Sequence, residues 1–239
     1  MKYDFHSHIL PGIDDGAKNV EESVKLLDDM AADGVDIVVA TPHFYCMKTT
    51  IEKFLDNRNE AYEKLKPCLK PEHPKILLGA EVLYDHSLVG NDDLRLLAMQ
   101  DTGFLLLEMP YAEITEKIVQ GVDEIVGGRQ VKVLVAHIER YLSFTSYKSL
   151  CELMELDVLG QINAESLKHF GSRRNCFKLI KDGYVHVMGT DMHRIERHYA
   201  SLGAGMAVIE KKFGGGILRQ MEENGEKLLK DCTYRQVIA

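Results

Sequence analysis

Short apolar runs rich in Val, Ile and Leu alternate along this chain with longer segments of helical periodicity. Buried parallel strands beneath crossover helices produce this pattern, because both faces of such strands are covered. Asn19 and Gly34 bracket the first helix, and Pro67 follows the second helix, predicted over 51–65. We expect a helix after every strand. The predicted strands cover residues 3–8, 36–43, 75–83, 103–109, 131–138, 159–163 and 186–191.

Seven strand–helix units joined by short loops favour a closed or nearly closed barrel over an open sheet. The 239 residues show no break in composition, which suits one α/β domain over residues 1–239. We therefore predict a distorted TIM-like (β/α)7 barrel in a single domain, with an open doubly wound sheet as the alternative. The G-x-G-x-x-G and G-x-x-x-x-G-K-[ST] motifs are missing, so dinucleotide-binding and Walker-type folds lose their main support.

Composition excludes several classes of protein. Hydrophobic residues make up 45% of the chain and charged residues 28%, which excludes a disordered or fibrous chain. The formal charge of −8, from 29 basic and 37 acidic residues, argues against a nucleic-acid groove. No run approaches the ~20 apolar residues of a membrane span, and the first residues lack the apolar core of a signal peptide. We expect a cytoplasmic protein that neither binds nucleic acid nor inserts into a membrane.

The cysteines indicate reduced thiols in a reducing compartment, because their number is odd and no C-x-x-C pair occurs. None is followed by Arg six positions later, so the C-x5-R motif of thiol-based tyrosine phosphatases is missing. We expect no catalytic thiol. The cysteines are Cys46, Cys68, Cys151, Cys176 and Cys232.

Polar side chains stand at the carboxyl ends of six predicted strands, where a parallel barrel carries its active face. Because side chains alternate along a strand, His6 and His8 point to the same side, and so do Asp191 and His193. The loop after the first strand adds an acidic pair. The remaining groups of this kind are Asp14, Asp15, His43, Glu81, Glu108 and His137.

Each of these groups has a structural explanation on its own, such as a hydrogen-bonded His pair or an acid paired with Lys. Together they interrupt apolar runs such as 105–107 and 133–136, where a buried charge costs several kcal/mol unless it is paired or metal-bound. Imidazole and carboxylate groups are ligands for zinc, iron and manganese. The set exceeds the three or four ligands of one ion. We therefore predict a multinuclear metal centre.

In chain order the motifs read H-S-H with I-D-D-G, T-P-H, G-A-E, an apolar strand ending in E, A-H-I-E-R-Y and T-D-M-H. This order resembles the polymerase and histidinol phosphatase (PHP) superfamily. Within it, the chain is most similar to the bacterial metal-dependent protein-tyrosine phosphatases of capsule and exopolysaccharide biosynthesis. The resemblance extends from Tyr3 to about Lys230 and implies a distorted seven-stranded β/α barrel.

The resemblance implies a three-metal cluster in which Glu81 bridges two ions. Asp15 is preferred to Asp14 as a ligand because it precedes a glycine. Arg140 resembles a phosphate-binding position and is the predicted catalytic and substrate-binding residue, with an ion pair to Glu139 or another acid as the alternative. We expect two or three divalent ions as cofactors, with Mn favoured over Fe or Zn. The implied ligands are His6, His8, Asp15, His43, Glu81, Glu108, His137, Asp191 and His193.

The loop after His43 departs from the pattern of relatives that carry basic residues there. Residues 44–48 read F-Y-C-M-K, so no phosphate-binding Arg is present in this loop. We expect its aromatic character to seat a tyrosine ring, and Arg194 or Arg197 to supply positive charge to the substrate.

The implied reaction is hydrolysis of phosphotyrosine by a metal-bridging hydroxide, without a covalent phosphoenzyme. The expected partner is a tyrosine-phosphorylated protein, which the resemblance implies to be a bacterial tyrosine autokinase of capsule or exopolysaccharide biosynthesis. One alternative is a phosphatase of histidinol phosphate or another small phosphomonoester, which would use the same ligands. The other is a non-catalytic metal-binding partner in polysaccharide assembly. The sequence does not indicate an oligomeric state.

Overall fold

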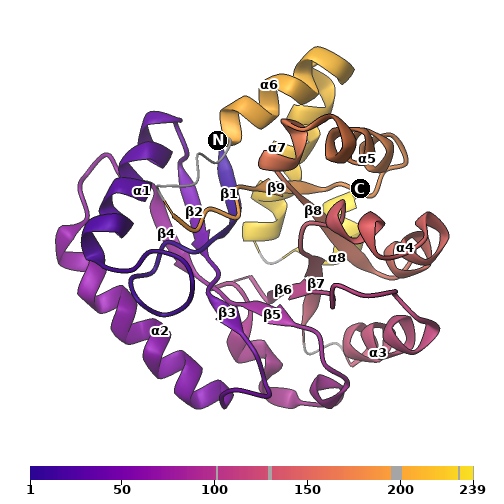
Figure 1. Cartoon of the computed structure of the whole chain (residues 1–239), viewed down its shortest axis with the longest axis horizontal. Helices are drawn as coiled ribbons and strands as arrows, with labels where there is room; N and C mark the ends of the chain where they lie inside the picture. Colours follow the sequence, from indigo (N-terminus) through magenta and orange to yellow (C-terminus); the bar gives the residue numbers. More distant parts are fainter. Residues whose placement is uncertain (101, 129–130, 195–200, 231, 239) are drawn as a thin grey trace.

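All strands of the computed structural model pair in parallel and lie in two sheets, which helices surround (Figure 1). The structure describes residues 1–100, 102–128, 131–194, 201–230 and 232–238. One sheet has the order β1-β2-β4 and the other the order β3-β5-β6-β7-β8-β9. The strands are β1 (Tyr3–Ser7), β2 (Ile37–Ala40), β3 (His43–Phe44), β4 (Lys75–Leu78), β5 (Glu81–Leu83), β6 (Phe104–Glu108), β7 (Lys132–Val135), β8 (Val158–Asn163) and β9 (Val187–Gly189).

The second and third predicted strands each break into two. Residues 41–42 separate β2 from β3, and Pro42 within this break has no N–H for a strand ladder. Residues 79–80 separate β4 from β5. The breaks pass the chain from one sheet to the other, and they place His43 opposite Glu81 in the β3–β5 register.

The two sheets meet where β1 lies beside β9. The Asp191 N–H donates to the His6 carbonyl at 2.7 Å, and the His8 N–H donates to the Met192 carbonyl at 2.8 Å. The buried Asp4 carboxylate accepts hydrogen bonds from the Thr190 hydroxyl at 2.6 Å and the Thr190 N–H at 2.9 Å. The predicted α/β class with parallel strands is therefore confirmed. The strands form two sheets that join at this seam.

The first two α-helices have the boundaries that the sequence predicts. The Asn19 side chain accepts the Glu22 N–H at the start of α1, and the Thr50 side chain accepts the Lys53 N–H at the start of α2. The α-helices are α1 (Val20–Ala32), α2 (Ile51–Leu65), α3 (Glu116–Gly127), α4 (Tyr147–Met154), α5 (Phe170–Lys181), α6 (Leu202–Phe213), α7 (Gly215–Leu229) and α8 (Tyr234–Ile238).

The prediction of a helix after every strand is wrong at β5. Two 3-10 helices, η2 (His86–Leu88) and η3 (Asp92–Leu97), follow that strand instead. The Asp85 and Asn91 side chains accept backbone N–H groups two residues ahead, and Gly90 has a φ of 75°. Such local turns compete with α-helical hydrogen bonding and end the regular structure.

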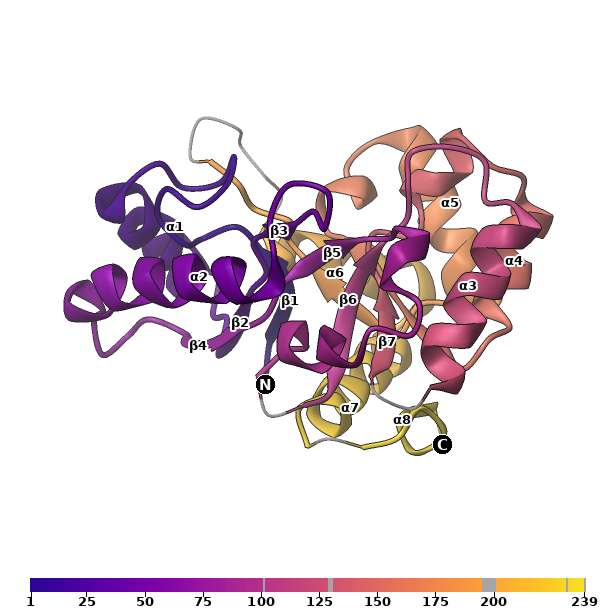
Figure 2. The same ribbon diagram turned by 90° about the horizontal axis from the view of Figure 1, so that it is seen from below.

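Apolar side chains fill the end of the molecule at which the strands begin. Phe5, Leu106 and Leu134 of three strands form one buried cluster with Leu228 of α7 and Val237 of α8. Figure 2 shows α7 and α8 at this end of the strands. No α-helix among the described residues has the length and apolar character to cross a membrane. The predicted histidine and carboxylate ligands follow or end the strands, so they lie at the opposite end from this cluster.

Candidate metal centre

His6 and His8 aim their rings at a common point, as the alternation of side chains predicts. Their Nε2 atoms are 3.2 Å apart, and each lies 3.3 Å from Oε2 of Glu81. All three side chains are buried. Two imidazole nitrogens and a carboxylate oxygen are therefore held facing one another.

Glu81 is the centre of the cluster because four histidines surround its carboxylate. Besides His6 and His8, His137 Nε2 lies 2.9 Å from Oε1, and His43 Nδ1 lies 2.9 Å from Oε2 without hydrogen-bond geometry. Burial alone would raise the Glu81 pKa, but His6 and the hydrogen bond from His137 hold it well below its usual value. The surrounding imidazoles thus favour the anionic form of Glu81.

Asp191 joins the same cluster from the segment after β9. Its Oδ1 lies 3.3 Å from His6 Nε2, and its Oδ2 lies 2.6 Å from Nη2 of Arg140. Asp191 and His137 have φ values of 54° and 31°, a region that residues other than glycine rarely adopt. Backbone strain of this kind gathers at functional sites.

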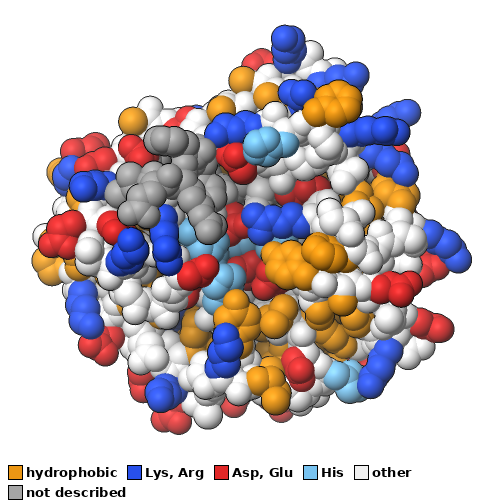
Figure 3. Space-filling view, in the orientation of Figure 1, with side chains coloured by type: hydrophobic (Ala, Val, Ile, Leu, Met, Phe, Trp, Pro, Cys, Tyr) orange, Lys and Arg blue, Asp and Glu red, His pale blue; other side chains and the backbone are white. Residues whose placement is uncertain are grey.

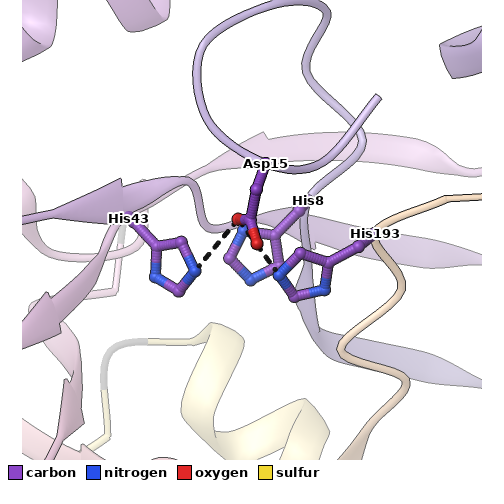
Figure 4. A group of neighbouring side chains, drawn as sticks. All are labelled: His8, Asp15, His43 and His193. Atoms are coloured by element: carbon purple, nitrogen blue, oxygen red, sulfur yellow. Dashed lines mark ion pairs between the residues drawn. The ribbon is translucent and has the colours of Figure 1, made fainter. Parts of the chain in front are cut away.

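A second group of ligands lies at the mouth of the site (Figure 4). The Asp15 carboxylate descends from the loop after β1 and lies between His43 and His193, with Oδ1 3.4 Å and 3.5 Å from their Nε2 atoms. The His8 and His193 rings stack with centroids 3.9 Å apart. Asp15 is 62% exposed, so this group faces incoming substrate.

The donor set fits divalent cations. In each of four groups the ligand atoms lie within 4.8 Å of one another, and together the groups contain all nine predicted ligands. Glu81 Oε2, His43 Nδ1 and His137 Nδ1 are buried without a hydrogen-bond partner, as expected of atoms whose partner is an ion. The groups are His8, Asp15, His43 and His193; His6, His137 and Asp191; His6, His8 and Glu81; and His43, Glu81 and Glu108.

Glu108 shows the excess of negative charge in this cluster. Burial and the neighbouring charge of Glu81 raise the Glu108 pKa to about 7. Two adjacent buried carboxylates cannot both ionise cheaply without a cation. The electrostatics therefore agree with the geometry.

Asp14 has a different place from its neighbour Asp15. Its Oδ2 lies 2.8 Å from His8 Nδ1 and accepts the His43 N–H at 3.0 Å. Burial alone would raise the Asp14 pKa, but the hydrogen bond from His8 lowers it to about 2. Asp14 orients His8 through the ring nitrogen that faces away from the cluster, as carboxylates behind metal-binding histidines do.

Strand β8 supplies supporting residues that the sequence prediction missed. Gln161 Oε1 accepts the His137 N–H at 2.8 Å and lies 3.3 Å from His6 Nδ1. Asn163 accepts from the Gln161 amide at 2.7 Å and donates to Asp191 Oδ2 at 2.9 Å. The available signal was two amides spaced two residues apart in an otherwise apolar strand, which share one face.

A cavity of about 500 Å³ opens over the cluster, and aromatic side chains form part of its wall. Figure 3 shows His and acidic side chains in a hollow near the middle of this face. Tyr45 stacks on His43 with centroids 5.3 Å apart, and Tyr111 stacks on His137 at 6.2 Å. The sequence prediction missed Tyr111, although it lies only three residues beyond the end of β6. Of the predicted aromatic loop, Tyr45 lines the cavity, while Phe44 is buried.

The predicted arginines differ in position. Arg140 lines the cavity, where it pairs with Asp191 and its Nη1 donates to the Tyr111 hydroxyl at 3.3 Å. Glu139 instead accepts from the Ser166 hydroxyl at 2.6 Å. Arg194 donates from Nε to the Asp15 carbonyl at 2.9 Å and is not among the residues that line the cavity. Arg197 lies outside the described residues.

Fold and site together define a parallel α/β protein with a candidate multinuclear metal centre at the carboxyl ends of its strands. The chain belongs to the family described as capsular polysaccharide synthesis, CpsB/CapC, whose sequence profile matches residues 2–230. This membership confirms the resemblance that the motifs indicate.

The similar proteins cover nearly the full length of the chain. It is 27% identical to tyrosine-protein phosphatase CpsB of Streptococcus agalactiae serotype III (strain NEM316), over 95% of this chain and 98% of that one. It is 26% identical to tyrosine-protein phosphatase YwqE of Bacillus subtilis (strain 168), over 98% and 94%. The chain also superposes, with a TM-score of 0.82 and 23% identity, on a crystal structure from a study of YwqE from Bacillus subtilis and CpsB from Streptococcus pneumoniae. That study calls the two proteins "unique metal-dependent tyrosine phosphatases". The superposition covers 97% of this chain and 95% of that one.

Proposed function

We propose that this chain is a metal-dependent protein-tyrosine phosphatase. One observation carries the proposal: imidazoles and carboxylates converge beneath a cavity whose wall holds Tyr45, Tyr111 and Arg140. The names of the relatives support it, since CpsB and YwqE are tyrosine-protein phosphatases.

The cofactors of the proposed enzyme are two or three divalent ions, with manganese favoured. The mixture of imidazole and carboxylate donors accommodates Mn, Fe or Zn. Bound ions of this kind lower the pKa of a water molecule toward neutrality and offset the charge on phosphate oxygens. The residues that would hold them are His6, His8, Asp15, His43, Glu81, Glu108, His137, Asp191 and His193.

Within the cavity, the side chains of the wall bind and orient the substrate. Arg140 is the proposed catalytic residue that binds the phosphate, and its ion pair with Asp191 fixes the guanidinium beside the cluster. Tyr45 and Tyr111 offer ring faces for the substrate's own ring. Arg194, held by the Asp15 carbonyl, is the second proposed source of positive charge for the substrate.

The proposed reaction transfers the phosphoryl group directly to water. A bond forms between the water oxygen and phosphorus while the bond from phosphorus to the phenolic oxygen breaks, which yields tyrosine and inorganic phosphate. The phenol has a pKa of about 10, so it leaves more readily than an alkoxide of Ser or Thr. Among the described residues that line the cavity there is no cysteine to form a phosphoenzyme.

The proposed substrate is a tyrosine-phosphorylated protein, and a bacterial tyrosine autokinase of capsule biosynthesis is the proposed partner. The CpsB/CapC family description supports a role in capsular polysaccharide synthesis. The two tyrosines of the wall favour an aryl phosphate over histidinol phosphate, because a phenyl ring offers a larger and more apolar face for stacking than an imidazole ring.

We further interpret residues 1–239 as one domain and its two sheets as a distorted (β/α)7 barrel. A buried apolar cluster that runs from Ile9 to Met221 supports the single domain, and the β1–β9 seam supports the barrel. The free thiols of all five cysteines support a reducing compartment, which we propose is the cytoplasm.

Turnover of three substrates tests the proposal: a phosphotyrosine peptide, histidinol phosphate and a phosphoserine peptide, each with and without chelator and with Mn²⁺ restored. We expect preference for phosphotyrosine, loss with chelator and recovery with Mn²⁺. Activity on histidinol phosphate alone would support the small-molecule alternative, and no turnover with any metal would support the non-catalytic alternative.

Arg140→Lys tests the phosphate-binding role. Lysine keeps the charge but loses the planar pair of donors, so we expect kcat/KM for the phosphotyrosine peptide to fall about 10–100-fold, the equivalent of one charged hydrogen bond. Metal content, measured by elemental analysis, should stay unchanged. An unaltered kcat/KM would show that Arg140 has no catalytic role.

A further inference from the structure

A second depression adjoins the metal cavity and has the opposite charge. It has a volume of about 1150 Å³ and lies between the segment from η4 (Arg140–Ser143) to the start of α4 on one side and α5 with the end of α6 on the other. Arg140 lines both hollows, so the second depression continues from the metal cavity. We call it the basic groove, and its cations are Arg173, Arg174, Lys178, Lys181 and Lys212.

The charge of the groove contrasts with that of the whole chain and of the cavity. The chain carries a net charge of −8, and carboxylates line much of the metal cavity. Glu139 is the acidic residue in the described lining of the groove, and it is buried with its carboxylate turned to Ser166 and the Asn163 N–H. Figure 3 shows Lys and Arg side chains gathered over α5 and α6.

The groove cations are not paired within the part of the chain that the structure describes. Three nearby carboxylates have other partners: Glu152 pairs with Lys148, Glu165 pairs with Lys168, and Asp182 accepts from the Tyr147 hydroxyl. Lys178 lies over the Tyr147 ring, 3.0 Å from its centroid, and Lys212 lies over the Phe177 ring at 5.9 Å, so the contacts of these two lysines are with rings and not with carboxylates among the described residues. An anionic partner could therefore bind in the groove without first breaking ion pairs of these cations.

Size and apolar surface indicate a polypeptide rather than a small anion. Small-molecule pockets measure roughly 300–1,000 Å³, which the groove exceeds. Apolar side chains lie among its cations, namely Leu142, Phe170, Phe177 and Phe213, and Phe170 is 79% exposed. An apolar surface rimmed by charged side chains is typical of a protein-binding site. A peptide offers both carboxylates for the cations and apolar side chains for such a surface.

We propose that the basic groove binds an acidic segment of the phosphoprotein substrate, adjoining the phosphotyrosine in the chain. This inference rests on the proposed function. Arg140 marks the boundary at which the phosphate site ends and the groove begins, so one chain can occupy both. A long nucleic acid is disfavoured because the rest of this acidic protein repels it. The groove lies on one side of the cavity, so acidic residues should act on one side of the phosphotyrosine.

Steady-state kinetics on matched peptides test the groove. The peptides carry three glutamates before the phosphotyrosine, three glutamates after it, or glutamines at all these positions. The variant R174Q/K178Q removes two exposed cations one turn apart on α5, and K25Q/K75Q removes two exposed cations from α1 and β4 as the matched control. p-Nitrophenyl phosphate, which has no flanking residues, reports on the metal centre alone.

Two exposed ion pairs would form between the groove and an acidic peptide. We therefore expect the KM of one of the acidic peptides to be about fivefold lower than that of the glutamine peptide. Added salt should diminish this difference in KM. R174Q/K178Q should lose this difference while kcat and p-nitrophenyl phosphate turnover stay unchanged, and K25Q/K75Q should keep it. Equal KM values for all peptides with the unsubstituted enzyme would overturn the inference and leave the phosphatase intact. Competition by a single-stranded oligonucleotide but not by the acidic peptide would also overturn it. No turnover of any substrate would instead contradict the proposed function.

Discussion

At the scale of single residues, Asp14 and Asp15 show how two adjacent carboxylates acquire different roles. Asp14 is nearly enclosed and receives a hydrogen bond from His8 and backbone N–H groups, whereas Asp15 points into the mouth between His43 and His193. One carboxylate therefore supports a ligand and the other is placed to be one.

Asp14→Asn tests this division. Asparagine keeps the shape but weakens the hydrogen bond to His8, so we expect metal affinity to fall about 10–100-fold, as for other supporting residues. Excess Mn²⁺ should restore turnover in Asp14→Asn more fully than in Asp15→Asn, which loses a direct donor. Chelator competition measures the affinity, and equal effects of the two substitutions would contradict the division.

At the scale of elements, the approach of β9 to β1 brings the ligands together. A Cβ atom at Gly189 would lie 2.6 Å from His6 Cβ and 3.0 Å from Gln161 Nε2, so only glycine lets the strands approach this closely. The segment that follows β9 then brings Asp191 to His6 of β1 and His193 to His8 just beyond it.

Gly189→Ala should therefore destabilise the fold and displace His6. Overpacking of this kind costs about 1–3 kcal/mol, and we expect a lower midpoint in urea together with weaker metal binding. Gly127→Ala is the matched control, because a Cβ there meets nothing within 4 Å. An unchanged midpoint for Gly189→Ala would show that the seam is looser than the structure indicates.

His186, directly before β9, links β8, β9 and α7. Its Nδ1 accepts the Gly160 N–H at 2.9 Å, and its carbonyl accepts the Asn224 side chain at 3.1 Å. Burial lowers the His186 pKa to about 4. The folded protein therefore excludes a proton that the unfolded chain binds below pH ~6.5.

The free energy of unfolding should fall as the pH drops from about 6.5 to about 4, with His186 contributing up to about 1.4 kcal/mol per pH unit. His186→Asn retains an acceptor for Gly160 but does not titrate, so its acid slope should be shallower by that amount. Urea unfolding at several pH values measures the slope. The exposed His169→Asn should match the unsubstituted protein, and identical slopes for all three proteins would contradict the assignment.

At the scale of the whole molecule, charge is separated between two neighbouring hollows. The carboxylates of the metal cavity repel one another unless cations offset them, and the basic groove beside it is positive. The stability of the fold should thus depend on the charges of the metal cavity, and the choice of substrate on the charges of the basic groove.

Removal of metal should lower the thermal midpoint. Ions at 100 times their dissociation constant stabilise by about 2.7 kcal/mol, which corresponds to roughly 5–10 °C for a domain of this size. Differential scanning fluorimetry with chelator, and then with Mn²⁺ restored, measures the shift. A midpoint insensitive to both would argue that the cluster binds no ion.

The sequence by itself determined the candidate ligands and the strands that they end or follow. Parallel strands bring their carboxyl ends to one edge, so residues as distant as His6 and Asp191 could be grouped from their positions on strands alone. The same local rules predicted α1 and α2, because caps and helix-ending residues lie within a few positions of the helix.

Only the tertiary structure decided which partners these residues meet. Arg140 pairs with Asp191 rather than with its neighbour Glu139, Asp14 supports His8, and Gln161 of a strand without ligands holds His137. The basic groove likewise combines cations of two helices far apart in the chain. The local sequence pattern determines which face of its own helix or strand a side chain occupies. Its contacts depend on how the elements pack, and the spacing of residues in the chain does not specify that packing.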